Sequence, residues 1–166
     1  MIACFDVDYQ NKRAQAACII FDQWSDASPV ASYTKVISPV ADYVSGQFYK
    51  RELPCILGVY DLIKEPINYI VLDSYVYLNS AAKPGLGAYL YDHFKQQIPI
   101  IGVAKNAFKE DNKLAISILR GGSQKPLYIS SAGVETQLAA QWVTTMHGQY
   151  RFPTLLKAVD QLARNW

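Results

Sequence analysis

The sequence predicts a mixed-sheet α/β domain, and three features of its 166 residues indicate this class. Three apolar, partly β-branched runs follow one another near the N-terminus with short polar turns between them, as in an antiparallel meander. The remaining chain alternates segments of helical spacing with short apolar runs. Hydrophobic residues make up 51% and charged residues 18% of the chain, which is typical of a folded globular protein and excludes a disordered one.

The individual elements follow from periodicity and from turn-forming residues. Apolar residues recur at helical spacing after Phe48, and Glu65-Pro66 ends that helix. We expect helices over residues 48–64, 88–97, 136–147 and 153–165. We expect strands over residues 2–7, 14–22, 30–38, 68–77, 99–103, 114–119 and 127–130, the last two as a pair. No internal repeat or linker divides the chain, so residues 1–166 are expected to form a single domain.

Charge, cysteines and hydropathy restrict the protein class. The net charge of +2 and the pI of about 8.3 permit nucleic-acid binding without indicating it. The three cysteines form no CxxC pair, so a zinc site and a disulfide framework are not expected. No basic leader precedes the first strand, and no apolar stretch is long enough to span a bilayer. We expect a soluble, cytoplasmic monomer without a membrane partner.

Two carboxylates interrupt apolar strands. Asp6 follows Ile2-Ala3-Cys4-Phe5, and Asp73 follows Tyr69-Ile70-Val71-Leu72 in the run that best suits a central strand. Buried carboxylates cost several kcal/mol unless they are compensated, and a divalent cation such as Mg²⁺ or Mn²⁺ would compensate both. Such ions suit phosphodiester hydrolysis, because they polarise phosphate oxygens and activate water. The alternative is that both aspartates cap turns at strand ends, and the pattern alone does not decide.

Two further acids lie near these aspartates in the sequence. Asp8 would share a strand face with Asp6, but its neighbours Tyr9 and Gln10 place it in a solvated turn. Glu52 stands near the start of a helix, where a negative charge is common for reasons unrelated to chemistry. From the pattern alone, neither is expected to bind metal.

Six segments, in order and over most of the chain, resemble the endonuclease V family. They are CFDVDY, YVSGQFYKRELP, YIVLDSYVY, PIIGVAKN, RGGSQKPLYISSAG and GQYRFPTLLKAVDQLA. Asp6 and Asp73 fall on the two strand aspartates of the family, and Glu52 falls on the glutamate of its Arg-Glu segment. Lys105 falls on the lysine of its Ile-Gly-Val-Ala-Lys motif.

The resemblance implies a ribonuclease-H-like fold and a metal-dependent endonuclease of DNA repair. The family cuts DNA on the 3′ side of inosine, a deaminated base, and leaves 5′-phosphate ends. On this resemblance Asp6, Glu52 and Asp73 would be catalytic and hold Mg²⁺, or alternatively Mn²⁺. Lys105 would lie near the scissile phosphate as a point charge. The family's strand-separating wedge falls on Tyr43, Val44, Ser45 and Gly46, and a base pocket is expected between Gly46 and the strand after Asp73.

The sequence departs from the family pattern in the substrate-reading parts. Ser45 replaces the wedge proline, and Ser74 replaces the glycine after the second aspartate. Of the family's His-Pro-Arg-Arg turn, only Lys83 keeps a positive charge for nucleic-acid binding. The histidine expected after LYIS is missing, and Glu135 could act as a fourth metal ligand in its place. The alternative for Glu135 is an acid at a helix N-terminus.

These departures leave three other functions open. The first is a nuclease of the same fold that selects RNA or branched and mismatched DNA. The second is a nucleic-acid-binding domain with weakened catalysis, although a pure binder has little use for converging carboxylates that repel phosphate. The third is a structural domain without a nucleic-acid role.

Overall fold

The chain is described by a computed structural model that covers residues 1–166. Its seven strands form one sheet in the order β3-β2-β1-β4-β5-β7-β6. The strands are β1 (Ile2–Gln10), β2 (Arg13–Phe21), β3 (Ala31–Ile37), β4 (Tyr69–Leu72), β5 (Ile100–Ala104), β6 (Ile116–Ile118) and β7 (Leu127–Ala132). The helices are α1 (Phe48–Tyr60), α2 (Leu86–His93), α3 (Thr136–Thr145) and α4 (Thr154–Arg164).

The sheet is mixed, as the sequence predicts. β1, β2 and β3 form the expected antiparallel meander. β4 pairs in parallel with β1, and β5 pairs in parallel with β4. β7 runs antiparallel to β5 and pairs with β6, which confirms the expected hairpin. The carboxyl ends of β1, β4 and β5 therefore meet at one edge of the sheet, while the carboxyl end of β7 lies at the opposite edge.

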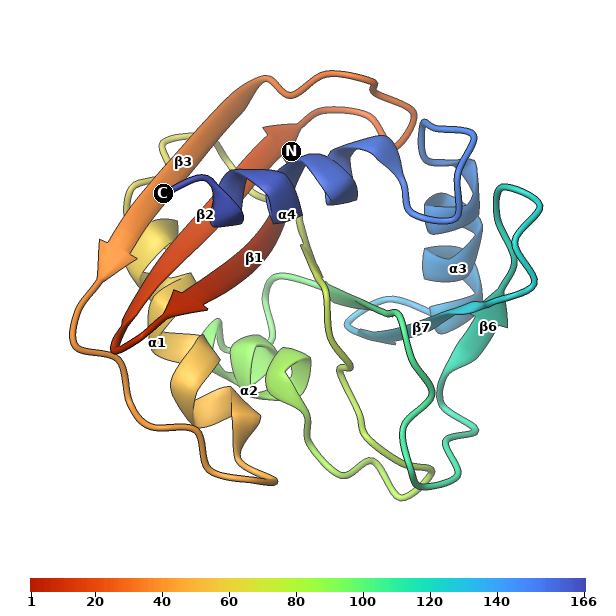
Figure 1. The fold of residues 1–166 in the computed structure, drawn as a ribbon. Helices are drawn as coiled ribbons and strands as arrows, with labels where there is room; N and C mark the ends of the chain where they lie inside the picture. The colour runs from red at the N-terminus through yellow and green to blue at the C-terminus, as the bar shows by residue number, and fades with distance from the viewer.

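Helices cover both faces of the sheet (Figure 1). One apolar core joins α3 and α4 to the face that carries Ile2 and Cys4 of β1. A second core joins α1 and α2 to the opposite face, which carries Ala3 and Phe5. Because successive side chains of a strand alternate between faces, Asp6 belongs to the face that α4 covers.

A buried glutamine attaches α4 to the sheet. Gln15 of β2 is 6% exposed, and its amide donates hydrogen bonds to the carbonyls of Leu162, Ala163 and Asn165. These carbonyls belong to the last turn and the C-cap of α4, where helical partners are missing. The contact holds α4 across β1 and β2, so that its inward face lies over the middle of β1 (Figure 1).

Among the elements whose boundaries differ from the sequence prediction, β4, α1 and α2 differ for identifiable physical reasons. β4 ends at Leu72 instead of residue 77, because the chain then crosses over β5, and Val76 donates its N–H to the hydroxyl of Ser130. α1 ends at Tyr60 instead of residue 64, in a turn that the N–H groups of residues 61–63 close. α2 begins two residues earlier than expected and ends at His93, because Lys95 and Gln96 adopt left-handed backbone angles.

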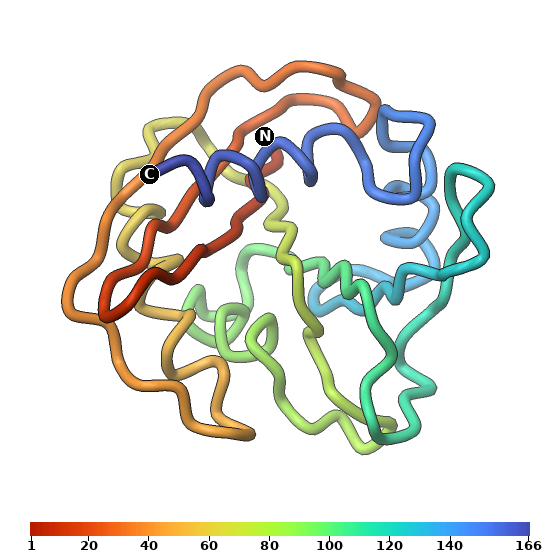
Figure 2. The backbone as a smooth tube through the Cα atoms, in the orientation of Figure 1, coloured from red at the N-terminus to blue at the C-terminus, as the bar shows by residue number.

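Hydrogen bonds join the two loops that lie beyond the carboxyl ends of β4 and β5. Figure 2 shows residues 77–84 and 106–113 running side by side at the bottom of the view. Asn79 donates to Glu110, the N–H of Ser80 donates to the carbonyl of Asp111, and Asn112 donates to the carbonyl of Tyr77. None of the helices is both long enough and apolar enough to cross a membrane.

Arg120 is expected to be a strong determinant of stability. It is 7% exposed and donates hydrogen bonds to five carbonyls, those of Thr144, Met146, Gly148, Tyr150 and Arg151. Arg120→Met would leave these carbonyls without the donor, so we expect the free energy of unfolding to fall by about 2–4 kcal/mol. Urea denaturation measures this, with Lys157→Met on the exposed face of α4 as a control expected to change stability by less than about 0.5 kcal/mol. Equal effects of both substitutions would contradict this role.

Candidate active site

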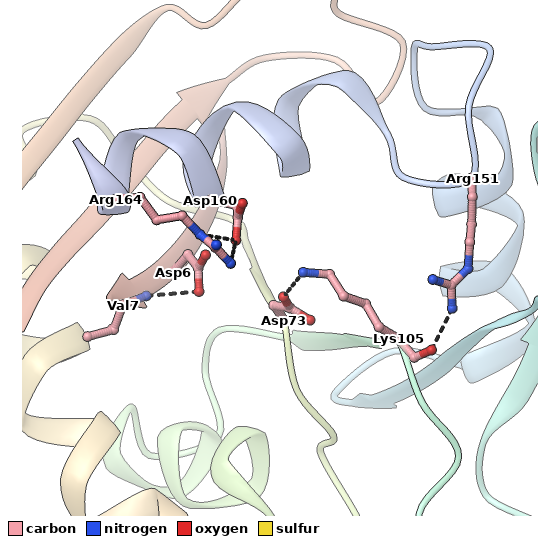
Figure 3. A network of polar contacts seen from close by, with 7 residues as sticks. All are labelled: Asp6, Val7, Asp73, Lys105, Arg151, Asp160 and Arg164. Carbon is pink, nitrogen blue, oxygen red and sulfur yellow. Dashed lines mark hydrogen bonds and ion pairs between the residues drawn. The ribbon is translucent and has the colours of Figure 1, made fainter. Parts of the chain in front are cut away.

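Strand register brings the two strand aspartates together. Phe5 of β1 pairs with Leu72 of β4, so the next residues along the two parallel strands are Asp6 and Asp73. Both carboxyl groups lie on the face that α4 covers, where Figure 3 shows them beneath the helix. Lys105 follows directly after β5, at the same edge of the sheet. Three adjacent parallel strands thus supply two carboxylates and one ammonium.

A fourth carboxylate, which the sequence analysis did not identify, comes from α4. The Asp160 side chain points down from the helix toward Asp6 and is 23% exposed (Figure 3). One of its oxygens lies 3.0 Å from Nη2 of Arg164, one turn further along α4. Burial is the largest cause of the raised pKa values of Asp6 and Asp73, and Asp160 makes a smaller contribution to each.

Glu52 belongs to α1, which covers the opposite face of the sheet from α4. It is the fifth residue of α1 and is 7% exposed, so it is not the solvated helix-terminal acid that its sequence position favours. The hydroxyl of Tyr9 donates a 2.9 Å hydrogen bond to its carboxylate. The guanidinium of Arg51 lies 3.7 Å from the centre of the Tyr9 ring, and its buried Nε has no hydrogen-bond acceptor.

Lys105 is paired with Asp73. Its Nζ lies 2.7 Å from the carboxylate of Asp73, and the two side chains are 34% and 26% exposed. Burial raises the pKa of Asp73, while the hydrogen bond and charge of Lys105 act in the opposite direction. The structure therefore places the Lys105 ammonium beside Asp73, one of the three predicted acids.

Burial opposes the ionisation of Asp6, Glu52 and Asp73. Burial, and then the charge of Asp73, raise the pKa of Asp6 to about 7, with a further contribution from Asp160. Burial, and then the charges of Asp6 and Asp73, raise the pKa of Glu52 to about 8, although the Tyr9 hydrogen bond opposes this. At neutral pH the cluster therefore lacks enough positive charge to keep all its carboxyl groups ionised.

The donor chemistry of the cluster suits a hard divalent cation. Its ligand atoms are carboxylate oxygens, which Mg²⁺ and Mn²⁺ prefer, and a cation would relieve the repulsion that raises their pKa values. The structure does not present them as a ready-made ligand set, since no three acidic, histidine or cysteine side chains are gathered tightly enough to hold an ion. Asp73 faces Lys105, and one oxygen of Asp6 accepts the N–H of Val7 (Figure 3).

A cavity of about 240 Å³ is lined by Ser74, the residue after Asp73, where the base pocket is expected. Gly46 and Ser74 line it, and aromatic walls come from Tyr75 and Phe108, whose ring centres are 6.0 Å apart. Ser74 does not close the cavity, although it replaces a glycine of the family pattern. Ser74 also lines a more open depression that contains Asp73 and Lys105. Asp73 of the acid cluster and Ser74 of the cavity lining are therefore neighbours in the chain.

The predicted wedge loop borders this cavity. Tyr43 and Gly46 line the cavity, and Tyr43 is 60% exposed. Val44 and Ser45 are exposed but do not line the cavity. Lys83 precedes the lining residue Pro84, and its Nζ lies 3.7 Å from Glu110, so it stands at the rim with its charge partly paired.

Glu135 matches the alternative of an acid at a helix N-terminus, whereas Asp8 lies differently from its sequence interpretation. Glu135 is exposed at the start of α3, which follows β7. Because Ala132 pairs with Ile100 at the amino end of β5, Glu135 lies at the opposite edge of the sheet from Lys105. Asp8 lies within β1 instead of a turn, and it accepts a hydrogen bond from the Trp166 indole.

The chain is similar in sequence and in fold to known endonuclease V proteins. A family profile described as Endonuclease V matches residues 1–117. The crystal structure of endonuclease V from Streptomyces avermitilis is 28% identical, with a TM-score of 0.78 over 98% of this chain and 79% of that one. No curated protein sequence matches the chain.

Two further solved structures share the fold. Human ENDOV is 21% identical, with a TM-score of 0.80 over 98% of this chain and 82% of that one. Endonuclease V from Ciona intestinalis, solved with a 24mer DNA containing an inosine followed by a ribo-adenosine, is 17% identical, with a TM-score of 0.81 over 98% and 84%. These likenesses confirm the expected ribonuclease-H-like fold.

Proposed function

The chain belongs to the endonuclease V family of nucleases, and on that premise we propose that it cleaves DNA at a phosphodiester bond 3′ to inosine or another deaminated base, with Mg²⁺ or Mn²⁺ as cofactor and a role in DNA repair. The observation that carries the proposal is the position of Ser74. This residue lines both the cavity of about 240 Å³ and the depression around Asp73 and Lys105. A base held in the cavity would place a neighbouring phosphate over the acids.

The cavity supplies the chemistry of base recognition. Tyr75 and Phe108 offer apolar ring surfaces, and Gly46 leaves the backbone open to close approach. Extruding a base costs stacking energy, which aromatic contacts offset, and deaminated bases pair weakly and are therefore extruded more readily. The exposed ring of Tyr43 would fill the space that the extruded base leaves. The inosine-containing DNA bound by the Ciona intestinalis protein supports this substrate class.

The acids and the lysine have separate roles in this proposal. Asp6, Glu52, Asp73 and Asp160 would hold the cation, which when bound supplies Lewis-acid stabilisation of the charge that develops on the phosphate. Lys105, 2.7 Å from Asp73, places an ammonium where a phosphate oxygen would approach the acids. Tyr9 orients the Glu52 carboxylate through its hydroxyl.

Cleavage of matched oligonucleotides tests the proposal. DNA duplexes and single strands carrying one inosine, their adenine counterparts and the equivalent RNAs are incubated with Mg²⁺, Mn²⁺ or EDTA. We expect cleavage 3′ to inosine that requires metal and is lost in Asp73→Asn. Equal cleavage of adenine DNA would refute base selectivity, preferential cleavage of RNA would assign the RNA substrate instead, and binding without cleavage in any metal would indicate a binding domain.

Asp160→Asn is expected to lower the cleavage rate by about 10- to 100-fold at saturating Mg²⁺, because it removes one carboxylate from the proposed cation site. Asp8→Asn is the matched control. It lies on the same face of β1, two residues from Asp6, but is bonded to Trp166 outside the cluster. We expect the control to retain activity within about twofold. Equal activities of the two variants would exclude Asp160 from the site.

A further inference from the structure

The charged end of Lys105 is held from two directions. Its Nζ lies 2.7 Å from Asp73 and 4.4 Å from the centre of the Phe152 ring. A lysine side chain has several free torsions, and a third of this one is exposed. Without a second contact, the ammonium could move away from Asp73 into solvent, so the ring face of Phe152 restricts where it points.

The backbone of Lys105 is held as well, by the residue next to Phe152. Arg151 donates a 2.5 Å hydrogen bond from Nη2 to the carbonyl of Lys105 (Figure 3). The same guanidinium donates to the carbonyls of Lys125 and Pro126 at 2.9 and 2.7 Å. It therefore joins the end of β5, the start of β7 and the chain that leads into α4. A rigid guanidinium suits this task, because its donors point in fixed directions.

We propose that Phe152 is a positioning residue for the cleavage reaction, which holds the Lys105 ammonium beside Asp73 through its ring face while Arg151 holds the Lys105 backbone. The role of Lys105 rests on the proposed nuclease function. The segment that carries both residues also leads directly into α4, so one stretch of chain places Lys105 and Asp160 on the same site.

Phe152 also packs against the core beneath α4, and a purely structural role must be separated from positioning. Phe152→Leu keeps an apolar side chain but removes the ring face, whereas Phe152→Tyr keeps both. We expect Phe152→Leu to lower kcat about two- to five-fold with little change in KM, which corresponds to about 0.5–1 kcal/mol for a partly exposed cation–π contact. Phe152→Tyr should restore the wild-type rate.

The decisive comparison repeats these substitutions in a Lys105→Met background. If Phe152 acts through Lys105, Phe152→Leu has no further effect on the residual rate there. The same fold-loss in both backgrounds would overturn the proposal, because it would reflect packing alone. Failure of Phe152→Tyr to restore the rate would also overturn it.

A second measurement needs no catalysis and distinguishes failure of this inference from failure of the proposed function. In ¹³C-labelled protein, the Lys105 Hε resonances, assigned with Lys105→Arg, should be shifted upfield by the ring current of Phe152. The shift should vanish in Phe152→Leu and remain in Phe152→Tyr. A protein with this shift but without nuclease activity would refute the function alone. An active protein without the shift would refute the role of Phe152 alone.

Discussion

Asp6→Asn is expected to abolish cleavage and, at the same time, to make the cation-free protein more stable at pH 8. Burial and the charges of Asp73 and Asp160 raise the pKa of Asp6 to about 7, so its ionised form is disfavoured in the folded state. Asparagine removes this cost, and we expect the free energy of unfolding at pH 8 to rise by about 1–3 kcal/mol. Loss of a cation ligand should lower the cleavage rate by about a thousandfold or more.

The raised pKa of Asp6 determines how the stability of the cation-free protein changes with pH. Between pH 4 and pH 7 the folded protein keeps a proton on Asp6 that the unfolded chain has already released. Its stabilising effect is complete below the unfolded pKa and is lost as the pH rises through about 7. The cation-free wild type should therefore lose stability over this range, and Asp6→Asn should lose less. Mg²⁺ should restore stability to the wild type at pH 8 but not to the variant.

Urea denaturation at pH 5 and pH 8, with and without Mg²⁺, measures these differences. Asp8→Asn is again the matched control, and we expect it to follow the wild type in every condition. If Asp6→Asn lowered stability at pH 8, or if Mg²⁺ stabilised it as much as the wild type, the acid cluster would not be the site of cation binding.

Gly102→Ala is expected to damage the site through the backbone. A Cβ at Gly102 of β5 would lie 2.3 Å from the carbonyl oxygen of Ser74 and 2.8 Å from the hydroxyl of Ser130. The segment after Asp73 must then move away from the sheet, and that segment lines both the cavity and the depression around Lys105. We expect a loss of about 1–3 kcal/mol in the free energy of unfolding and about a hundredfold in cleavage rate.

Gly58→Ala provides the control for this substitution. Gly58 lies inside α1, where an added Cβ would meet its nearest neighbour, Lys35, at 3.6 Å, an ordinary contact distance. Alanine is also a better helix former than glycine, so this variant should be at least as stable as the wild type. Denaturation and cleavage assays on both variants measure the effect. Wild-type cleavage by Gly102→Ala would contradict the close packing of residues 74–76 on β5.

The sheet could be predicted from the sequence because its strands are apolar runs that polar turns or helical segments separate. The apolar runs of β1, β2 and β3 with short turns indicated the meander, and the isolated apolar runs of β4 and β5 indicated central strands. The end of β4 could not be predicted, since Tyr75, Val76 and Tyr77 continue the apolar and aromatic composition of the strand. Their departure depends on the close approach of Ser74 to Gly102, a tertiary contact.

The acids were predicted to different extents. Asp6 and Asp73 stand out because each interrupts an apolar run, whereas Glu52 entered only through the resemblance of its segment. Asp160 was missed because, with Arg164 four residues later, it looks like an ordinary helix-surface ion pair. Its position next to Val159 and between Leu156 and Ala163, on the buried side of α4, was the available signal.

The aromatic and backbone supports of the site were not predictable from local sequence. Phe108 and Phe152 lie outside the predicted strands and helices. Their contacts with Tyr75 and Lys105 join residues that are distant in the sequence and form only when the chain folds. The assignment of Glu135 depended on the direction of β7. Only the sheet topology reveals that this strand runs away from the site.

Anomalous diffraction from crystals soaked in Mn²⁺ tests most directly the claim that the acid cluster is a cation site. We expect one strong peak in contact with carboxylate oxygens of Asp6 and Asp73, within reach of Asp160 and Glu52. The peak should be absent from Asp6→Asn crystals treated in the same way. A wild-type structure with Mn²⁺ bound elsewhere and these four carboxylates free of metal would contradict the account.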